Sequence, residues 1–94
     1  MKTIYKYPLE QRNINEVEMP EGAEILSVQV QNEIPVLWAI VDTENPNEKR
    51  KIRIIGTGHE INACEMMIFI DTFQLPKLGL VFHVFEIPNY NKKL

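Results

Sequence analysis

Few side chains in this 94-residue sequence are of the kinds that carry out catalysis or bind soft metals. The candidates for a metal site are His59, Cys64 and His83, with Glu60 or Glu65 as an additional oxygen ligand. A structural zinc site needs about four converging ligands, which recur at short, regular spacings. The spacing of these residues matches no such motif. The sequence therefore predicts neither a metal site nor a cofactor.

Nucleophilic catalysis finds equally little support. Ser27 is the single serine, and it lies within a strand-like run without the sharp turn that presents a nucleophilic serine. Cys64 is the single cysteine, so no internal disulfide can form, and a reducing compartment is the simplest setting. We interpret Cys64 as a small residue near the edge of the core rather than as a nucleophile. The protein is therefore predicted not to be an enzyme.

The segment 56–59, Gly-Thr-Gly-His, resembles a phosphate-binding loop only superficially. It lacks the spacing of the P-loop, and no convincing helix follows it to present an N-terminus to a phosphate. We interpret the glycines as a bend that ends a strand. His59 remains a candidate interaction residue. An enzyme or metal-dependent module centred on His59 is the third of three functional hypotheses.

Charge is unevenly distributed along the chain, whose net charge is −3. Residues 10–44 include eight acids and a single base, Arg12, whereas the segments on either side are net positive. Such polarity can steer association with a charged partner, although solvated turns give the same pattern. The basic cluster at 49–53 lacks interleaved aromatic residues and belongs to an acidic chain, so nucleic acid is not an expected partner. We interpret this cluster as a charged strand start that protects a sheet edge.

The elements that must position these side chains are strands. Two apolar runs, 25–30 and 36–41, are separated by a short polar break, which is the pattern of a β-hairpin. In the first run, alternation predicts that Leu26, Val28 and Val30 face inward. The second run is apolar on both faces, so it is predicted to lie centrally, covered above and below. Trp38 in its middle is predicted to be the largest contributor to the core.

The same pattern continues along the rest of the chain, with further strands predicted at 3–7, 15–19, 49–55, 68–75 and 80–87. Residues 61–67 fit either one helical turn or an irregular connection. The connections are too short for parallel crossovers, so about seven short strands imply an antiparallel all-β sandwich or a small, partly open barrel. One domain is predicted over 1–87, followed by a polar tail at 88–94. The predicted core consists of Val28, Trp38, Ile40, Ile54, Phe82 and Val84.

The sequence contains no apolar stretch near the roughly 20 residues that a membrane helix needs. No apolar segment of the secretory type follows the first lysines. With 45% hydrophobic and 24% charged residues, the composition is that of an ordinary globular domain. We therefore expect a cytoplasmic protein without membrane contact.

Six short motifs carry a family resemblance: IYKYPL, ILSVQVQN, LWAIVD, KRKIRIIGTGH, DTFQ and LVFHVFE. Together they resemble a family of small uncharacterised proteins from bacteriophages and from bacterial genomes that carry prophages. The resemblance spans residues 1–86. It implies a phage or prophage association, and hence the host cytoplasm, but no activity or catalytic residues.

The leading functional hypothesis is a non-enzymatic phage or prophage accessory protein that acts by binding another protein, of the host or of the phage, or a second copy of itself. The alternative is an anti-defence inhibitor that binds a host nuclease or defence complex through its acidic segment. The candidate contact residues are Tyr5, Tyr7, Glu16, Glu18 and His59. Both tyrosines share one face of the first strand, which is a candidate sheet edge. The competing interpretation is that both tyrosines pack on the core.

Overall fold

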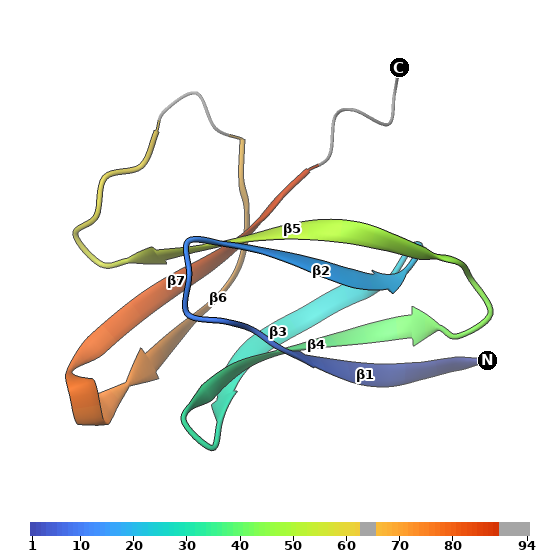
Figure 1. Cartoon of the computed structure of the whole chain (residues 1–94), viewed down its shortest axis with the longest axis horizontal. Coiled ribbons are helices and arrows are strands. Elements are labelled where there is room, and N and C mark those ends of the chain that lie inside the picture. Colours follow the sequence, from blue (N-terminus) through green and yellow to red (C-terminus); the bar gives the residue numbers. More distant parts are fainter. Residues whose placement is uncertain (63–65, 89–94) are drawn as a thin grey trace.

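The computed structural model, described here for residues 1–62 and 66–88, is a two-layer arrangement of antiparallel strands (Figure 1). The strands are β1 (Lys2–Pro8), β2 (Ile14–Pro20), β3 (Glu24–Gln31), β4 (Ile34–Asp42), β5 (Asn47–Gly56), β6 (Ile68–Leu75) and β7 (Leu80–Ile87). All pairings between neighbouring strands are antiparallel. The predicted all-β fold is therefore confirmed, as a sandwich rather than a closed barrel.

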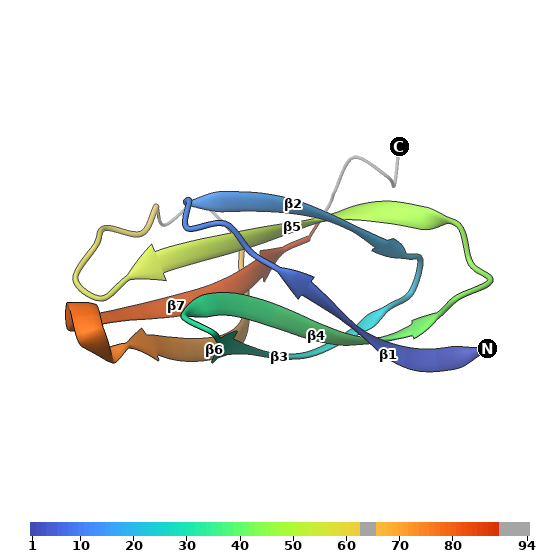
Figure 2. The same cartoon turned by 60° about the horizontal axis from the view of Figure 1, so that its bottom comes forward.

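The two sheets have the strand orders β1-β4-β3 and β2-β5-β7-β6. Strand β3 lies beside β6, so the sheets approach each other along one side (Figures 1 and 2). There the Asp71 carboxylate accepts hydrogen bonds from the Val28 amide at 3.1 Å and from Gln29 Nε2 at 3.0 Å. Strands β1 and β2 are the outer strands at the opposite side. The sandwich thus has a closed side at β3 and β6 and an open side at β1 and β2.

The predicted hairpin is formed by β3 and β4. Its turn consists of Asn32 and Glu33, which both have positive φ, at 53° and 65°. Positive φ at both central residues is the geometry of a type I′ turn, whose twist matches that of the paired strands. The polar break therefore fixes the register of the two apolar runs.

The core between the sheets includes several residues that are completely or almost completely buried: Met19, Val28, Leu37, Val41, Ile52 and Val84. Ile54 also belongs to it, and Phe82 packs against it. The prediction was wrong for Trp38 and Ile40, because Leu37, Ala39 and Val41 occupy the inward positions of β4. By alternation, Trp38 and Ile40 lie on the outer face, where both are half-buried. Strand β4 is central, as predicted, but the second sheet covers only one of its faces.

Two further sequence predictions are corrected. The β3 register shifts between Ile25 and Ser27, so Ile25 packs on the core while Leu26 is 43% exposed instead of facing inward. The basic cluster does not protect an edge, because β5 is paired on both sides, with β2 and β7. One of its members, Arg50, instead forms a two-pronged ion pair with Glu86, Nε to Oε2 at 2.5 Å and Nη2 to Oε1 at 3.1 Å.

The connection between β5 and β6 contains no helix or strand at residues 61, 62, 66 and 67. Cys64, and with it the interpretation of this residue, lies outside the described residues, as does most of the predicted tail. The short 3₁₀ helix of the described chain is at Pro76–Leu78, where a simple turn is predicted. Over the described ranges, no helix has the length and apolar character needed to cross a membrane.

Candidate functional site

Four of the five candidate contact residues lie on the two outer strands of the open side. Tyr5 and Tyr7 belong to β1, and Glu16 and Glu18 belong to β2. The two strands are joined by a short loop and run in opposite directions (Figures 1 and 2). His59 lies apart from them, just beyond the end of β5.

The backbone of β1 has a free edge whose members follow from its pairing with β4. The Met1 carbonyl accepts from the Thr43 amide at 2.9 Å, and the Leu9 amide donates to the Pro35 carbonyl at 2.8 Å. The register between these ends is unbroken, so the odd-numbered residues form the hydrogen-bonded pairs with β4. The residues whose N–H and C=O groups point away from the sheet are Lys2, Ile4 and Lys6.

The same reasoning defines a free edge on β2. The Ile54 amide donates to the Asn13 carbonyl at 2.9 Å, and the Glu21 amide donates to the Pro46 carbonyl at 2.8 Å. Odd-numbered residues of β2 are again the hydrogen-bonded ones, because its register with β5 is also unbroken. The residues whose backbone groups point outward are Ile14, Glu16 and Glu18.

A hollow of about 680 Å³, which we call the open cleft, lies where the end of β1 and the loop after it approach β2. Its lining includes Tyr7, Glu10, Asn15, Glu16 and Glu18, together with Lys51 of β5. Asn15 holds this loop in place, because its side-chain amide accepts from the Glu10 amide at 2.9 Å and donates to the Glu10 carbonyl at 3.0 Å. Asn15 is not among the residues predicted for the site, because its only signal in the sequence is a polar residue at an inward position of a strand.

The two tyrosines point toward the second sheet, because their partners in β4 are the core residues Ala39 and Leu37. Their rings meet edge to face, with centroids 6.4 Å apart. Tyr7 packs against the core, and burial together with the neighbouring Tyr5 raises the pKa of its hydroxyl. Tyr5 is 44% exposed. Packing on the core therefore describes Tyr7, whereas Tyr5 faces solvent and remains available for contact.

The two free edges carry opposite charges. Lys2 and Lys6 are exposed on β1, and Glu16 and Glu18 are exposed on β2. Lys6 donates to Gln31 Oε1 at 2.8 Å and lies 5.8 Å from the centre of the Trp38 ring, which places it on the outer face. Within the described part of the chain, neither Glu16 nor Glu18 forms an ion pair.

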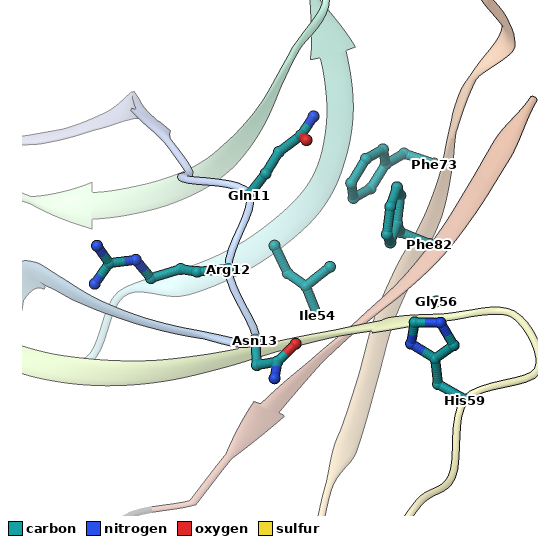
Figure 3. Close-up of a pocket in the computed structure, with 8 residues that line it drawn as sticks. All are labelled: Gln11, Arg12, Asn13, Ile54, Gly56, His59, Phe73 and Phe82. Carbon is teal, nitrogen blue, oxygen red and sulfur yellow. The ribbon is translucent and has the colours of Figure 1, made fainter. Parts of the chain in front are cut away.

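His59 lines a separate pocket of about 120 Å³ at the end of the sandwich (Figure 3). The stacked rings of Phe73 and Phe82, with centroids 5.3 Å apart, form its apolar wall. The imidazole lies against Gly56, where an added Cβ would come within 3.1 Å of the ring. Arg12 is turned away from the aromatic pair in Figure 3 and pairs with Glu10 at 2.8 Å. The pocket is too small for a typical organic cofactor, because such sites enclose several hundred Å³.

His83 is hydrogen-bonded on both ring nitrogens, as its position within a strand suggests. Nε2 lies 2.7 Å from the Thr57 hydroxyl, and Nδ1 lies 3.0 Å from the Thr72 hydroxyl. Residues 1–62 and 66–88 contain no group of three or more His, Cys, Asp or Glu side chains that could hold a metal ion. In the described structure His83 thus bridges two threonine hydroxyls, while His59 lies against Gly56.

The fold and the site define a class: a small antiparallel sandwich with one closed side and one open side, in which the outer strands have a single strand partner each within the described part of the chain. Within this class the chain belongs to a family described as a domain of unknown function, DUF7352, which matches residues 1–93. Comparison with curated proteins and with solved structures found no match.

Proposed function

We propose that this protein is a non-enzymatic binding module that contacts another protein chain through the free strand edges of its open side. One observation carries the proposal: β1 and β2, whose outer edges pair with no strand of the described residues, border the same cleft. Such edges bind by strand addition, in which backbone hydrogen bonds supply affinity and the neighbouring side chains supply specificity. Tyr5 adds an exposed ring of the kind enriched at interfaces.

The biological setting in the proposal is that of a phage or prophage accessory protein in the host cytoplasm. It rests on the resemblance of the six motifs, and belonging to a domain family of unknown function is compatible with it.

An inhibitor that binds a basic surface of a host nuclease is the second candidate, and the exposed Glu16 and Glu18 favour it. Their partners in the register of β5 are Lys51 and Lys49, which reduce the net negative charge of that face. The free edges therefore support binding more directly than acidic charge does.

A pair of substitutions at Ile4 tests the role of the edge. Ile4→Pro removes an outward-pointing amide without touching the hydrogen bonds to β4, and proline is tolerated on edge strands. Ile4→Ala removes the side chain and keeps the amide, so it is the matched control. We expect a tagged wild-type chain and the Ala variant to capture the same protein from cells, either another protein or an untagged copy, and the Pro variant to lose it.

The thermal unfolding midpoint of each variant is measured alongside, to confirm that both remain folded. Capture of the same proteins by all three forms would show that binding does not use this edge, and the proposal would then be wrong.

A further inference from the structure

We infer that the partner chain at the open side is a second copy of this protein, in a reciprocal dimer in which β1 of each copy pairs with β2 of the other. This inference rests on the proposed function, because it names the occupant of the same edges. It starts from the two free edges, which belong to one molecule, border one cleft and carry opposite charges.

The geometry of the sandwich permits both strand pairs to form at once. A two-fold axis that runs along the strands, midway between the sheets, exchanges the two layers and preserves the direction of every strand. The sheet of β1 is then continued by the sheet of β2 from the second copy, and the converse holds in the other layer. Since β1 and β2 run in opposite directions, each new pair is antiparallel (Figures 1 and 2). Two-fold symmetric contacts of this kind are the commonest form of homo-oligomer.

The charges on the edges select this pairing. In each antiparallel register that pairs two or more of these outward-facing residues, a lysine of β1, Lys2 or Lys6, lies opposite a glutamate of the second copy. Where Ile4 lies opposite Glu16 or Glu18 of the second copy, that carboxylate also lies diagonally between the two lysines. Directly opposed and diagonal neighbours on one face of a sheet are close enough for long charged side chains to interact. Each strand pair therefore gains at least one contact between directly opposed, opposite charges.

The other pairings of the same edges bring like charges together. Two β1 strands paired around Ile4 would place Lys2 opposite Lys6 at both ends. Two β2 strands paired around Glu16 would place the two Glu16 carboxylates directly opposite each other. Like charges in opposed positions destabilise a strand pair, so both alternatives are disfavoured.

The tyrosines fit the same arrangement. Tyr5 and Tyr7 point from β1 toward the layer between the sheets, and Tyr7 lines the open cleft. In the reciprocal dimer the open clefts of the two copies face each other across the two-fold axis. The exposed ring of Tyr5 then becomes covered, and the free amides of both edges gain partners.

Charge reversal on one edge at a time gives a specific test. The variant Lys2→Glu with Lys6→Glu has two acidic edges, and the variant Glu16→Lys with Glu18→Lys has two basic edges. By sedimentation equilibrium at low salt, we expect the wild type to dimerise and each variant alone to lose more than about tenfold in association constant. A mixture of the two variants restores opposite charges in both strand pairs, so it is expected to form a one-to-one heterodimer.

Other outcomes separate this inference from the proposed function. A wild-type chain that remains monomeric at high concentration, or variants that dimerise as well as the wild type, would overturn the reciprocal dimer. Capture of a different protein that is lost with Ile4→Pro would still support the binding role of the edge. A lowered thermal unfolding midpoint would show that a charge variant is poorly folded. In that case, dimerisation of Ile4→Pro is compared with that of Ile4→Ala. A dimer that Ile4→Pro leaves unaffected would also contradict the inference.

Discussion

The closed and open sides of the sandwich differ in how the backbone groups of their outer strands find hydrogen-bond partners. Each side has two outer strands from different sheets, with backbone groups that no strand within residues 1–62 and 66–88 pairs. On the closed side, Asp71 of β6 reaches across to the amide of Val28, so a side chain replaces the missing backbone partner. On the open side β1 and β2 stand apart and border the open cleft.

This difference underlies our proposal that the closed side stabilises the fold and that the open side binds a partner. A buried amide that already has a hydrogen-bond acceptor in its own chain is not available to pair with another strand. Val28 is fully buried, whereas Ile4 on the open edge is 56% exposed. The closed side is thus expected to govern folding stability, and the open side to govern association.

The largest expected effect comes from the aromatic packing between the sheets near the closed side. Phe73 is 3% exposed and stacks on Phe82. Phe73→Ala should destabilise the fold by about 3–5 kcal/mol, as large-to-small changes at buried aromatic positions do. Tyr7→Ala on the open side is the matched change and should cost less than half as much, because Tyr7 is only partly buried. Urea unfolding of both variants measures this, and equal losses would show that the two sides contribute equally.

The next effect concerns the side chain that joins β6 to β3. Asp71→Ala leaves the buried Val28 amide without its acceptor and should cost about 1–3 kcal/mol. Amide exchange at Val28 is expected to accelerate in the variant, while exchange at core positions of β5 changes only with the overall stability. Gln74→Ala, at an exposed position of the same strand, is the control. A free energy of unfolding within about 0.5 kcal/mol of the wild type would mean that the hydrogen bond from Val28 to Asp71 does not stabilise the fold.

Much of the fold could be predicted from the sequence because alternation and turn residues are local signals. They identified the seven strands and the β3–β4 hairpin. The face assignment failed on β4, where residues 36–41 are all apolar and alternation cannot tell which half faces the second sheet. Leu37, Ala39 and Val41 fill the space between the layers, which leaves the larger Trp38 outside. The extra residue at the β3 bulge likewise has no sequence signature, so Leu26 was assigned to the wrong face.

The candidate site could be predicted in part for a similar reason. Tyr5, Tyr7, Glu16 and Glu18 belong to consecutive strands, and sequence alone placed the first of these strands at an edge. That both strands are edges of the same open side follows only from the pairing of β1 with β4 and of β2 with β5, which are contacts between distant residues. His59 could not be separated from this group by sequence, because its distance from the cleft depends on the same long-range pairing.

A smaller effect is expected from the ion pair that also connects the two sheets near the closed side. Lys77 Nζ lies 2.8 Å from Glu33 Oε2, and both side chains are mostly exposed. Exposed pairs are screened by water, so Lys77→Ala should change the unfolding free energy by no more than about 0.5 kcal/mol. Urea unfolding at low and high salt measures this change. A loss comparable to that of Asp71→Ala would show that exposed charges, rather than the buried amide, hold the closed side together.

The smallest expected effect is the dependence of stability on alkaline pH at the open side. Burial, with a further contribution from Tyr5, raises the pKa of Tyr7 above its ordinary value of 10.0. The folded state therefore holds this proton more tightly than the unfolded state does. The resulting contribution to stability is complete below pH 10 and is lost as the pH rises through the raised pKa of the folded state.

Tyr7→Phe removes the titrating hydroxyl, so its loss of stability above pH 10 should be smaller than that of the wild type. Tyr5→Phe is the matched control and should reduce the alkaline loss less, because Tyr5 supplies the lesser cause of the shift in Tyr7. Urea unfolding at a series of pH values on either side of 10 gives the comparison. If the reciprocal dimer covers this edge, the difference between wild type and Tyr7→Phe should grow with protein concentration, since further burial raises the Tyr7 pKa further. If the wild type and Tyr7→Phe lose the same unfolding free energy above pH 10, the Tyr7 hydroxyl is fully solvated in the folded state and the open side does not cover it.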